Sequence, residues 1–355
     1  MKIPIPKSKN QLTVILPLKG RPKFTLRIMK FFNQTNFPYR IIIADGGSNE
    51  EIEKKLKNKK NFPNVNYSYQ RFPFDSSYTD YFKKMVASLK KVKTPYATLI
   101  DNDCFPVIQG LNDSVTFLNN NKEFSSCRGQ HVDFRLIPFS QVGMLYGSSI
   151  EIDHDYFDKK DSIWRSFTKA SPVERISEWS YCTSIMHYNV YRIDSLRRAW
   201  KFILKEDCCD LFFAEIALAL FGLALGKTKV LPSLFILRQQ NSPESESKAA
   251  IKKMDILDRM LFEKWTKDIN KLILEVTNIC FKKNSNHLNK LNVEKKIRLA
   301  LKQHYADRLF SFLLGRKYAS GASLIKTHKK ERVLISSSSK KYPQFNYILD
   351  FLRNE

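Results

Sequence analysis

Two acidic residues separated by one position, Asp101 and Asp103, follow the apolar segment 96–100 (YATLI). Carboxylate oxygens are ligands that hard divalent cations such as Mg²⁺ and Mn²⁺ prefer. A cation held there would neutralise the negative charge that develops on a departing diphosphate. A solvated turn can carry the same pair, but its position directly after a buried strand favours a metal-dependent site for a phosphate-bearing substrate.

Two further polar residues follow apolar segments. Asp45 comes directly after residues 39–44 (YRIIIA), and Arg21 comes three residues after the end of 12–18 (LTVILPL). Asp-Gly is a common turn pair, and a solvated cation is an ordinary turn residue, so both can be structural. Both can also contact a nucleotide, and Arg21 can bind the phosphate or the base of that nucleotide.

The elements that must position these residues alternate between strand and helix through the first hundred residues. Buried strands are predicted at 12–18, 39–44, 65–70 and 96–100, and helices at 24–32, 50–60 and 78–91. This alternation predicts an α/β fold with an open, mostly parallel sheet and helices on both faces. Ligands bind beyond the carboxyl ends of such strands, which is where the three acids stand.

The pattern is less regular after residue 140. Residues 140–180 are rich in aromatic and charged side chains, and we expect an insertion over the sheet that carries acceptor-binding loops. Later elements are predicted as a strand at 181–191, helices at 193–204 and 210–225, and a last strand at 229–237. A polar stretch with Pro243 then divides a catalytic domain, residues 1–240, from a basic helical C-terminal region, residues 241–355.

The order of these motifs resembles the glycosyltransferases of GT-A fold, family 2-like, over roughly residues 12–238. The motifs are Ile15-Leu16-Pro17 followed by Arg21, Asp45-Gly46-Gly47-Ser48, and Thr94-Pro95-Tyr96 leading to Asp101-Asn102-Asp103. The resemblance implies an inverting transfer of a sugar from a nucleotide-sugar donor to a hydroxyl of a glycan or lipid-linked acceptor. It also implies a divalent cation, Mn²⁺ or Mg²⁺, as cofactor, and surface polysaccharide synthesis as the setting.

The resemblance assigns roles to the donor-binding residues. Pro17 and Arg21 line the pocket for the base and ribose, and Asp45 contacts the nucleotide. Asp101 is similar to the ribose or metal contact of the family, and Asp103 is similar to its principal metal ligand.

The chain departs from the family pattern in two places. The family more often reads D-G-S-x-D, whereas this chain has an extra glycine and offers Glu50 as the second acid. Many relatives carry a histidine metal ligand after the last strand, where this chain has Arg238. Arg238 either holds the diphosphate as a bidentate donor or simply ends the strand. His131, His154 and His187 show no metal-ligand spacing, and we expect structural or acceptor-facing roles.

An inverting transfer requires a general base beside the acceptor hydroxyl. The family supplies it from an acidic motif at the start of a helix, and here that motif is Glu206-Asp207-Cys208-Cys209-Asp210. Asp210 is the expected base because it directly precedes the hydrophobic helix, and Asp207 is the second candidate. An ordinary N-cap explains the same position, and the two roles are compatible. Glu215 is expected to be buried and hydrogen-bonded or to contact the acceptor.

Composition and motifs limit the alternatives. The six cysteines form no C-x-x-C pair, which suits a reducing compartment, and no signal peptide or membrane span is expected, so the predicted location is the cytoplasm. Neither G-x-G-x-x-G nor a P-loop is present, which excludes dinucleotide oxidoreductases and P-loop enzymes. A sugar-nucleotide nucleotidyltransferase should open with a Gly-rich loop, but residues 18–22 (LKGRP) hold a single glycine.

The net charge of +25 leaves a non-enzymatic nucleic-acid-binding protein, an anionic membrane surface, or a residue bias as explanations. Acids at successive strand ends argue against nucleic acid. The charge is concentrated in residues 281–341, which hold sixteen Lys and Arg and three acids. The apolar stripe within them either docks on the catalytic domain or lies peripherally on the inner face of the membrane. This stripe comprises Ile297, Leu301, Tyr305, Leu309, Phe310 and Leu313. If it lies on the membrane, deletion of residues 245–355 should abolish vesicle binding.

Overall fold

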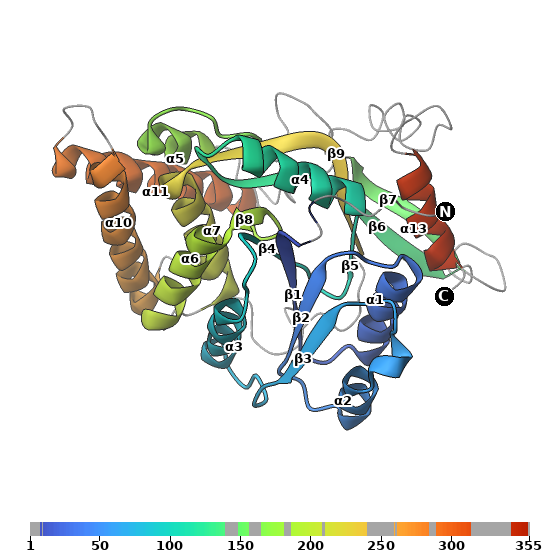
Figure 1. The fold of residues 1–355 in the computed structure, drawn as a ribbon. Coiled ribbons are helices and arrows are strands. Elements are labelled where there is room, and N and C mark those ends of the chain that lie inside the picture. Colours follow the sequence, from blue (N-terminus) through green and yellow to red (C-terminus); the bar gives the residue numbers. More distant parts are fainter. Residues whose placement is uncertain are drawn as a thin grey trace.

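The computed structural model describes residues 8, 10–138, 148–155, 165–180, 186–207, 210–239, 259, 261–283, 289–313 and 342–353. These residues form one nine-stranded sheet with helices on both of its faces (Figure 1).

The first four strands of the sheet are parallel and stand in the order β3–β2–β1–β4. They are β1 (Leu12–Leu18), β2 (Arg40–Asp45), β3 (Tyr67–Arg71) and β4 (Tyr96–Leu99). β1 is buried on both faces, since Ile15 belongs to one apolar core whereas Val14 and Leu16 belong to the other. A near-continuous apolar run is the sequence signature of such a strand.

The remaining strands continue the sheet from β4 in mixed orientation. They are β5 (Cys104–Pro106), β6 (Phe124–Pro138), β7 (Ser148–Asp155), β8 (Val190–Arg192) and β9 (Lys227–Gln239). β6 and β9 run parallel, whereas β8 is antiparallel to β4 and β6, β5 to β9, and β7 to β6. The predicted open α/β sheet with covered faces is confirmed, and its parallel character is concentrated in the first four strands.

Two apolar cores lie on the two faces of the sheet. One is formed with α3 (Tyr78–Lys90), α5 (Pro172–Ser180), α6 (Ile193–Lys205), α7 (Leu211–Leu225), α10 (Glu263–Lys283) and α11 (Lys290–Leu313). The other is formed with α1 (Pro22–Gln34), α2 (Glu50–Lys57), α4 (Ile108–Asn120) and α13 (Tyr342–Arg353).

Two predicted elements are shorter than expected. The helix predicted over residues 50–60 ends at Lys57, because Asn58 is extended with ψ 98°, and a 3-10 turn (Lys59–Asn61) follows. The strand predicted over 181–191 is represented by β8, because residues 186–189 form a turn closed by a hydrogen bond from Asn189 N–H to Met186 O. Residues 181–185 lie outside the described residues, as does the domain boundary proposed near residue 240.

The described helices of the C-terminal region join the apolar cores on both faces of the sheet. Ile297 and Leu301 of the predicted apolar stripe are buried in the core around α7, and Tyr305 packs against the same core. On the opposite face the ring of Phe351 in α13 lies 5.4 Å from the ring of Phe31. The described part of the stripe therefore docks on the sheet domain, and deleting residues 245–355 would uncover both cores. That deletion cannot test membrane binding.

In the part of the chain that the structure describes, no helix is long and apolar enough to cross a membrane.

Candidate functional site

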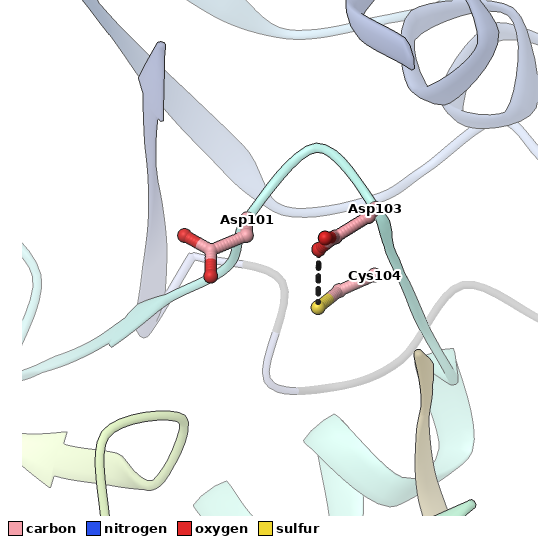
Figure 2. Close-up of side chains that lie close together, drawn as sticks. All are labelled: Asp101, Asp103 and Cys104. Atoms are coloured by element: carbon pink, nitrogen blue, oxygen red, sulfur yellow. Dashed lines mark hydrogen bonds between the residues drawn. The ribbon is translucent and has the colours of Figure 1, made fainter. Parts of the chain in front are cut away.

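The D-x-D turn stands between the end of β4 and the start of β5. A hydrogen bond from Cys104 N–H to Asp101 O (3.1 Å) closes the turn. One ligand atom each from Asp101, Asp103 and Cys104 lies within 4.8 Å of the others, and Figure 2 shows the two aspartates on either side of the turn, with Asp103 hydrogen-bonded to Cys104. Carboxylate oxygens at this spacing suit a hard divalent cation, so the donor set fits Mg²⁺ or Mn²⁺.

Arg21 fastens the start of α1 to this turn. Its Nη1 donates to Asp103 Oδ2 at 2.8 Å, and its Nη2 donates to Asn102 Oδ1. Asn102 is buried and donates in turn to Thr25 Oγ1 at 3.0 Å. These hydrogen bonds link the segment after β1 to the turn after β4, and the two strands are parallel neighbours in the sheet. The predicted contact of Arg21 with a phosphate or a base stays a prediction.

Asp101 is held by a group that the sequence did not single out. Tyr188 Oη donates to Asp101 Oδ2 at 2.6 Å. Burial acts to raise the pKa of Asp101, but the charges of His187 and Arg238, with the hydrogen bond from Tyr188, outweigh it and hold the pKa below its ordinary value. Burial lowers the pKa of His187 itself, so the cations that persist near Asp101 at neutral pH include Arg238 and Arg21. Asp101 is therefore ionised, as a metal ligand must be.

Arg238 brings a guanidinium to the same place from β9. It stands opposite Cys104 of β5 and Asp133 of β6 in the sheet register, and its guanidinium carbon lies 5.7 Å from the ring centroid of Tyr188. Among the described residues no group accepts a hydrogen bond from its buried Nε. Buried donors normally have a partner, so this N–H is available to an anionic ligand.

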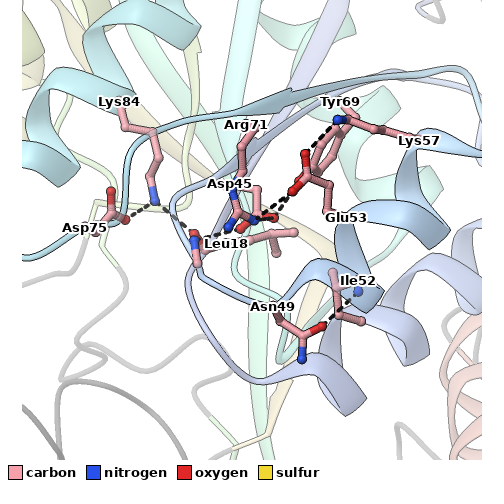
Figure 3. Close-up of polar contacts among 11 residues, drawn as sticks. Leu18, Asp45, Asn49, Ile52, Glu53, Lys57, Tyr69, Arg71, Asp75 and Lys84 are labelled. Atoms are coloured by element: carbon pink, nitrogen blue, oxygen red, sulfur yellow. Dashed lines mark hydrogen bonds and ion pairs between the residues drawn. The ribbon is translucent and has the colours of Figure 1, made fainter.

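Asp45 is fixed at the end of β2 by three donors (Figure 3). Its Oδ1 accepts from Gly47 N–H at 2.8 Å, and its Oδ2 accepts from Tyr69 Oη at 2.7 Å and from Arg71 Nη1 at 3.0 Å. The Gly47 contact is the turn geometry expected for an Asp-Gly pair. Arg71 also lies 3.9 Å from Glu53. A contact of Asp45 with the nucleotide stays a prediction.

Two side chains that contact Asp45, those of Tyr69 and Arg71, were not predicted from the sequence. Tyr69 and Arg71 point to one side of β3 because alternate residues share a face, and that alternation is the signal that would have found them. Glu50, offered as the second acid, is exposed at the start of α2. Pro17 lies in β1 beside Ala44 of β2, one residue before the strand ends.

A buried ion pair lies beneath the loops at the ends of β1 and β2 (Figure 3). Lys84 of α3 is 1% exposed, pairs with Asp75 and donates to Leu18 O at 2.9 Å. Asp75 lies against Gly46, where an added Cβ would come within 2.3 Å of Asp75 Oδ1. A side chain at position 46 would therefore displace Asp75 from its pair, and Lys84 ties α3 to Asp75 and to the end of β1. The position of Lys84 on an amphipathic helix did not predict that it is buried or that it pairs with Asp75.

The acidic cluster precedes α7. Asp210 is the N-cap of α7: its Oδ1 accepts from Phe213 N–H at 2.8 Å, and its Oδ2 accepts from Arg259 Nε at 3.0 Å. Asp207 is exposed, has a left-handed backbone (φ 48°) and accepts a hydrogen bond from Thr79. The predicted cap is present, and the assignment of the base stays a prediction. Cys208 and Cys209 lie outside the described residues.

Two tyrosines in the first turn of α3 respond to charges of the acidic cluster and of the D-x-D turn. Burial raises the pKa of Tyr81, and the nearby charges of Asp101, Asp75 and Glu215 raise it further. Burial also raises the pKa of Tyr78, and so does the charge of Asp210. These two tyrosines are three positions apart on one helical turn, so charges of both the D-x-D turn and the start of α7 act on the same short segment.

The histidines take different places. His131 is buried in β6, where its Nε2 lies 2.7 Å from Asp133 Oδ1 and its Nδ1 lies 3.1 Å from Arg128 Nη2. His187 is beside Asp101 and Arg238, as described above. The side chain of His154 lies outside the described residues.

Comparison with known proteins identifies the fold. No protein-family model matches the sequence, and no curated protein matches it. The structure resembles residues 1–349 of TarS from S. aureus in complex with UDP-GlcNAc, with a TM-score of 0.51 at 12% identity over 87% of this chain and 76% of that one. This likeness shows a GT-A-type glycosyltransferase fold, in agreement with the resemblance of the motifs.

Two further structures are similar. A longer TarS structure matches with a TM-score of 0.49 at 11% identity over 83% of this chain, and this chain spans 44% of its length. The mannosyltransferase PcManGT from Pyrobaculum calidifontis, in complex with GDP-Man and Mn²⁺, matches with a TM-score of 0.42 at 11% identity over 99% of this chain and 87% of that one.

Proposed function

We propose that this chain is a metal-dependent, inverting glycosyltransferase that moves a sugar from a nucleotide-sugar donor to a hydroxyl of a glycan or lipid-linked acceptor. One observation carries the proposal: Asp101, Asp103 and Arg238 meet at the end of β4 on a GT-A-type fold. Two ionisable oxygen ligands and a guanidinium with a free N–H are the groups that a cation-bound diphosphate requires.

The donor half of the site comprises the loops after β1, β2 and β4. Asp103 and Asp101 would hold Mn²⁺ or Mg²⁺, which when bound neutralises the charge of the departing nucleoside diphosphate. Arg21, held at Asp103, and Arg238 add positive charge beside the donor phosphates. Pro17 and Asp45 stand toward the nucleoside. Because the similar TarS fragment binds UDP-GlcNAc, a UDP-sugar is the first donor to test.

Asp210 is the proposed base for the acceptor hydroxyl, with Asp207 as the second candidate. Each carboxylate oxygen has two lone pairs, so Asp210 can accept from Phe213 N–H and Arg259 and still accept a proton. Asp210 is buried at the start of α7, and its charge acts on Tyr78 in the same turn of α3 where the charge of Asp101 acts on Tyr81. Asp207 is exposed and engaged with Thr79, which favours Asp210.

The cellular location and the biological role are proposed from the positive charge of the protein. We place residues 1–240 as the catalytic part and the basic residues 241–355 as a helical part packed on it, in a cytoplasmic protein that contacts the inner face of an anionic membrane. Leu274 and Phe281 are exposed on one side of the lysine-bearing helix α10, which supports such a contact. Surface polysaccharide synthesis on lipid-linked acceptors is the corresponding role.

A thermal-shift panel of UDP-, GDP-, dTDP- and CMP-sugars, each with and without Mn²⁺, tests the donor assignment. Binding to the folded state raises the melting temperature with ligand occupancy. One nucleotide class should stabilise the protein, and only when Mn²⁺ is present. Stabilisation by none of the four classes, at millimolar concentrations of each, would argue against the proposal.

A further inference from the structure

The loop between α6 and α7, residues 206–210, is fastened by basic side chains of the C-terminal region. Lys271 Nζ lies 2.9 Å from Glu206 Oε2, and Lys264 Nζ donates to Asp207 O at 2.7 Å. Arg259 Nε donates to Asp210 Oδ2 at 3.0 Å. Three cations from one stretch of chain thus contact three successive parts of the loop that holds the proposed base.

Of these contacts, the one between Arg259 and Asp210 is shielded from solvent. The Arg259 side chain is 16% exposed and that of Asp210 is 9% exposed, whereas Lys271 is 54% exposed. The guanidinium also lies over two aromatic rings, 4.5 Å from the centroid of Phe212 and 5.6 Å from that of Trp265. Stacking on both rings fixes its plane, and a shielded pair is weakened little by salt or by side-chain motion.

Arg259 removes the remaining freedom of the Asp210 carboxylate. The helix cap holds Oδ1 through Phe213 N–H, but a carboxylate held by one oxygen can still rotate about its Cβ–Cγ bond. The second hydrogen bond, from Arg259 to Oδ2, fixes that rotation. A general base must lie within hydrogen-bond reach of the proton that it removes, so the orientation of the carboxylate bears directly on turnover.

We propose that Arg259 is a positioning residue for Asp210, and that the C-terminal region thereby forms part of the acceptor side of the site. This inference rests on the proposed role of Asp210 as the base. It accounts for basic residues of the C-terminal region without any partner molecule: Arg259, Lys264 and Lys271 serve the catalytic part of the same chain.

The test compares substitutions at Arg259 by their effect on turnover and on donor binding. Arg259→Met retains a long apolar stem against Phe212 and Trp265 but lacks the donor, and Arg259→Lys restores a cation. Mn²⁺-dependent release of nucleotide from UDP-GlcNAc, or from whichever donor the thermal-shift panel identifies, gives kcat and KM. Lys267→Met is the matched control, because Lys267 lies on α10 and its one ion pair among the described residues is with the exposed Glu263.

We expect Arg259→Met to lower kcat about tenfold or more, with the donor KM within twofold of wild type, since the donor half of the site is untouched. Arg259→Lys should recover part of the loss, and Lys267→Met should behave as wild type. Unchanged kcat in Arg259→Met, or a Lys variant no better than Met, would overturn the inference. An increase in the donor KM by the same factor as the decrease in kcat would also overturn the inference, because it would indicate that the substitution perturbs the fold in general.

The proposed function and this inference fail in different ways. A wild-type protein that neither binds nor hydrolyses any of the four donor classes with Mn²⁺ contradicts the function. The contact is then tested by melting temperature, using Arg259→Met, Asp210→Asn and the double variant. A double variant that loses clearly less than the sum of the two single losses supports the pairing, and additive losses overturn it.

Discussion

Removing the buried charge of Lys84 should destabilise the protein more than any surface substitution. In Lys84→Met the Asp75 carboxylate keeps its burial but loses its cation, and its Oδ1 already has no hydrogen-bond partner among the described residues. Breaking a buried pair from one side costs about 3–5 kcal/mol. Leu18 O retains the N–H of Gly46, so the lost hydrogen bond there adds only about 1 kcal/mol. The expected loss is roughly 4–6 kcal/mol.

Such a loss is a large share of the roughly 5–15 kcal/mol that stabilises a folded protein. It is measured from the midpoint of urea unfolding, followed by tryptophan fluorescence. Lys83→Met is the control, because Lys83 is the exposed neighbour of Lys84, and it should change the midpoint little. Replacing both charges, in Lys84→Met with Asp75→Asn, should recover much of the stability, because no buried ion is left uncompensated.

The pH dependence of the Lys84→Met variant gives an internal check. Burial raises the pKa of Asp75, and Lys84 opposes that rise. Without Lys84 the folded-state pKa should be higher still, so the folded protein binds the proton more tightly than the unfolded chain. The stability of the Lys84→Met variant is therefore retained at low pH and lost as the pH rises through the pKa of Asp75 in the folded state. A deficit at pH 5 as large as at pH 8, or a midpoint equal to that of Lys83→Met, would refute the account of Lys84.

Three other predictions concern the site and the surface. Asp103→Ala should keep the fold but abolish the Mn²⁺-dependent thermal shift with donor; wild-type turnover at saturating donor would contradict the metal assignment. Asp210→Asn, which can still cap α7, should leave donor binding unchanged and lower turnover on the order of a hundredfold; if Asp207→Asn does this instead, Asp207 is the base. Leu274→Glu with Phe281→Glu should weaken salt-sensitive binding to anionic vesicles in a flotation assay, and unchanged binding would exclude that face of α10.

Much of the fold could be predicted from local pattern because its parallel strands are buried on both faces. Burial on both faces requires nearly continuous apolar runs, which is why the segments that became β1, β2 and β4 could be recognised. Parallel strands also end at one edge of the sheet, so the sequence predicts that Asp45 at the end of β2 and the acids after β4 lie along the same edge. The N-cap role of Asp210 was equally local, because a cap depends on a residue three positions away.

The partners of the site residues were decided only by tertiary packing. Arg21 reaches Asp103 across 82 positions, Tyr188 reaches Asp101 across 87, and Arg259 reaches Asp210 across 49. No local periodicity encodes such pairs, because each depends on how whole helices and strands pack together.

The burial of Lys84 could not be predicted from local sequence either. A lysine on an amphipathic helix is expected to face water, since an isolated charge is costly to bury. Only the fold brings Asp75 and the carbonyl of Leu18 to its ammonium group, and these contacts offset the cost of taking the charge out of water. The sequence by itself thus determined that the D-x-D turn follows a buried strand and that Asp210 caps α7, whereas the tertiary structure decided which side chains hold them in place.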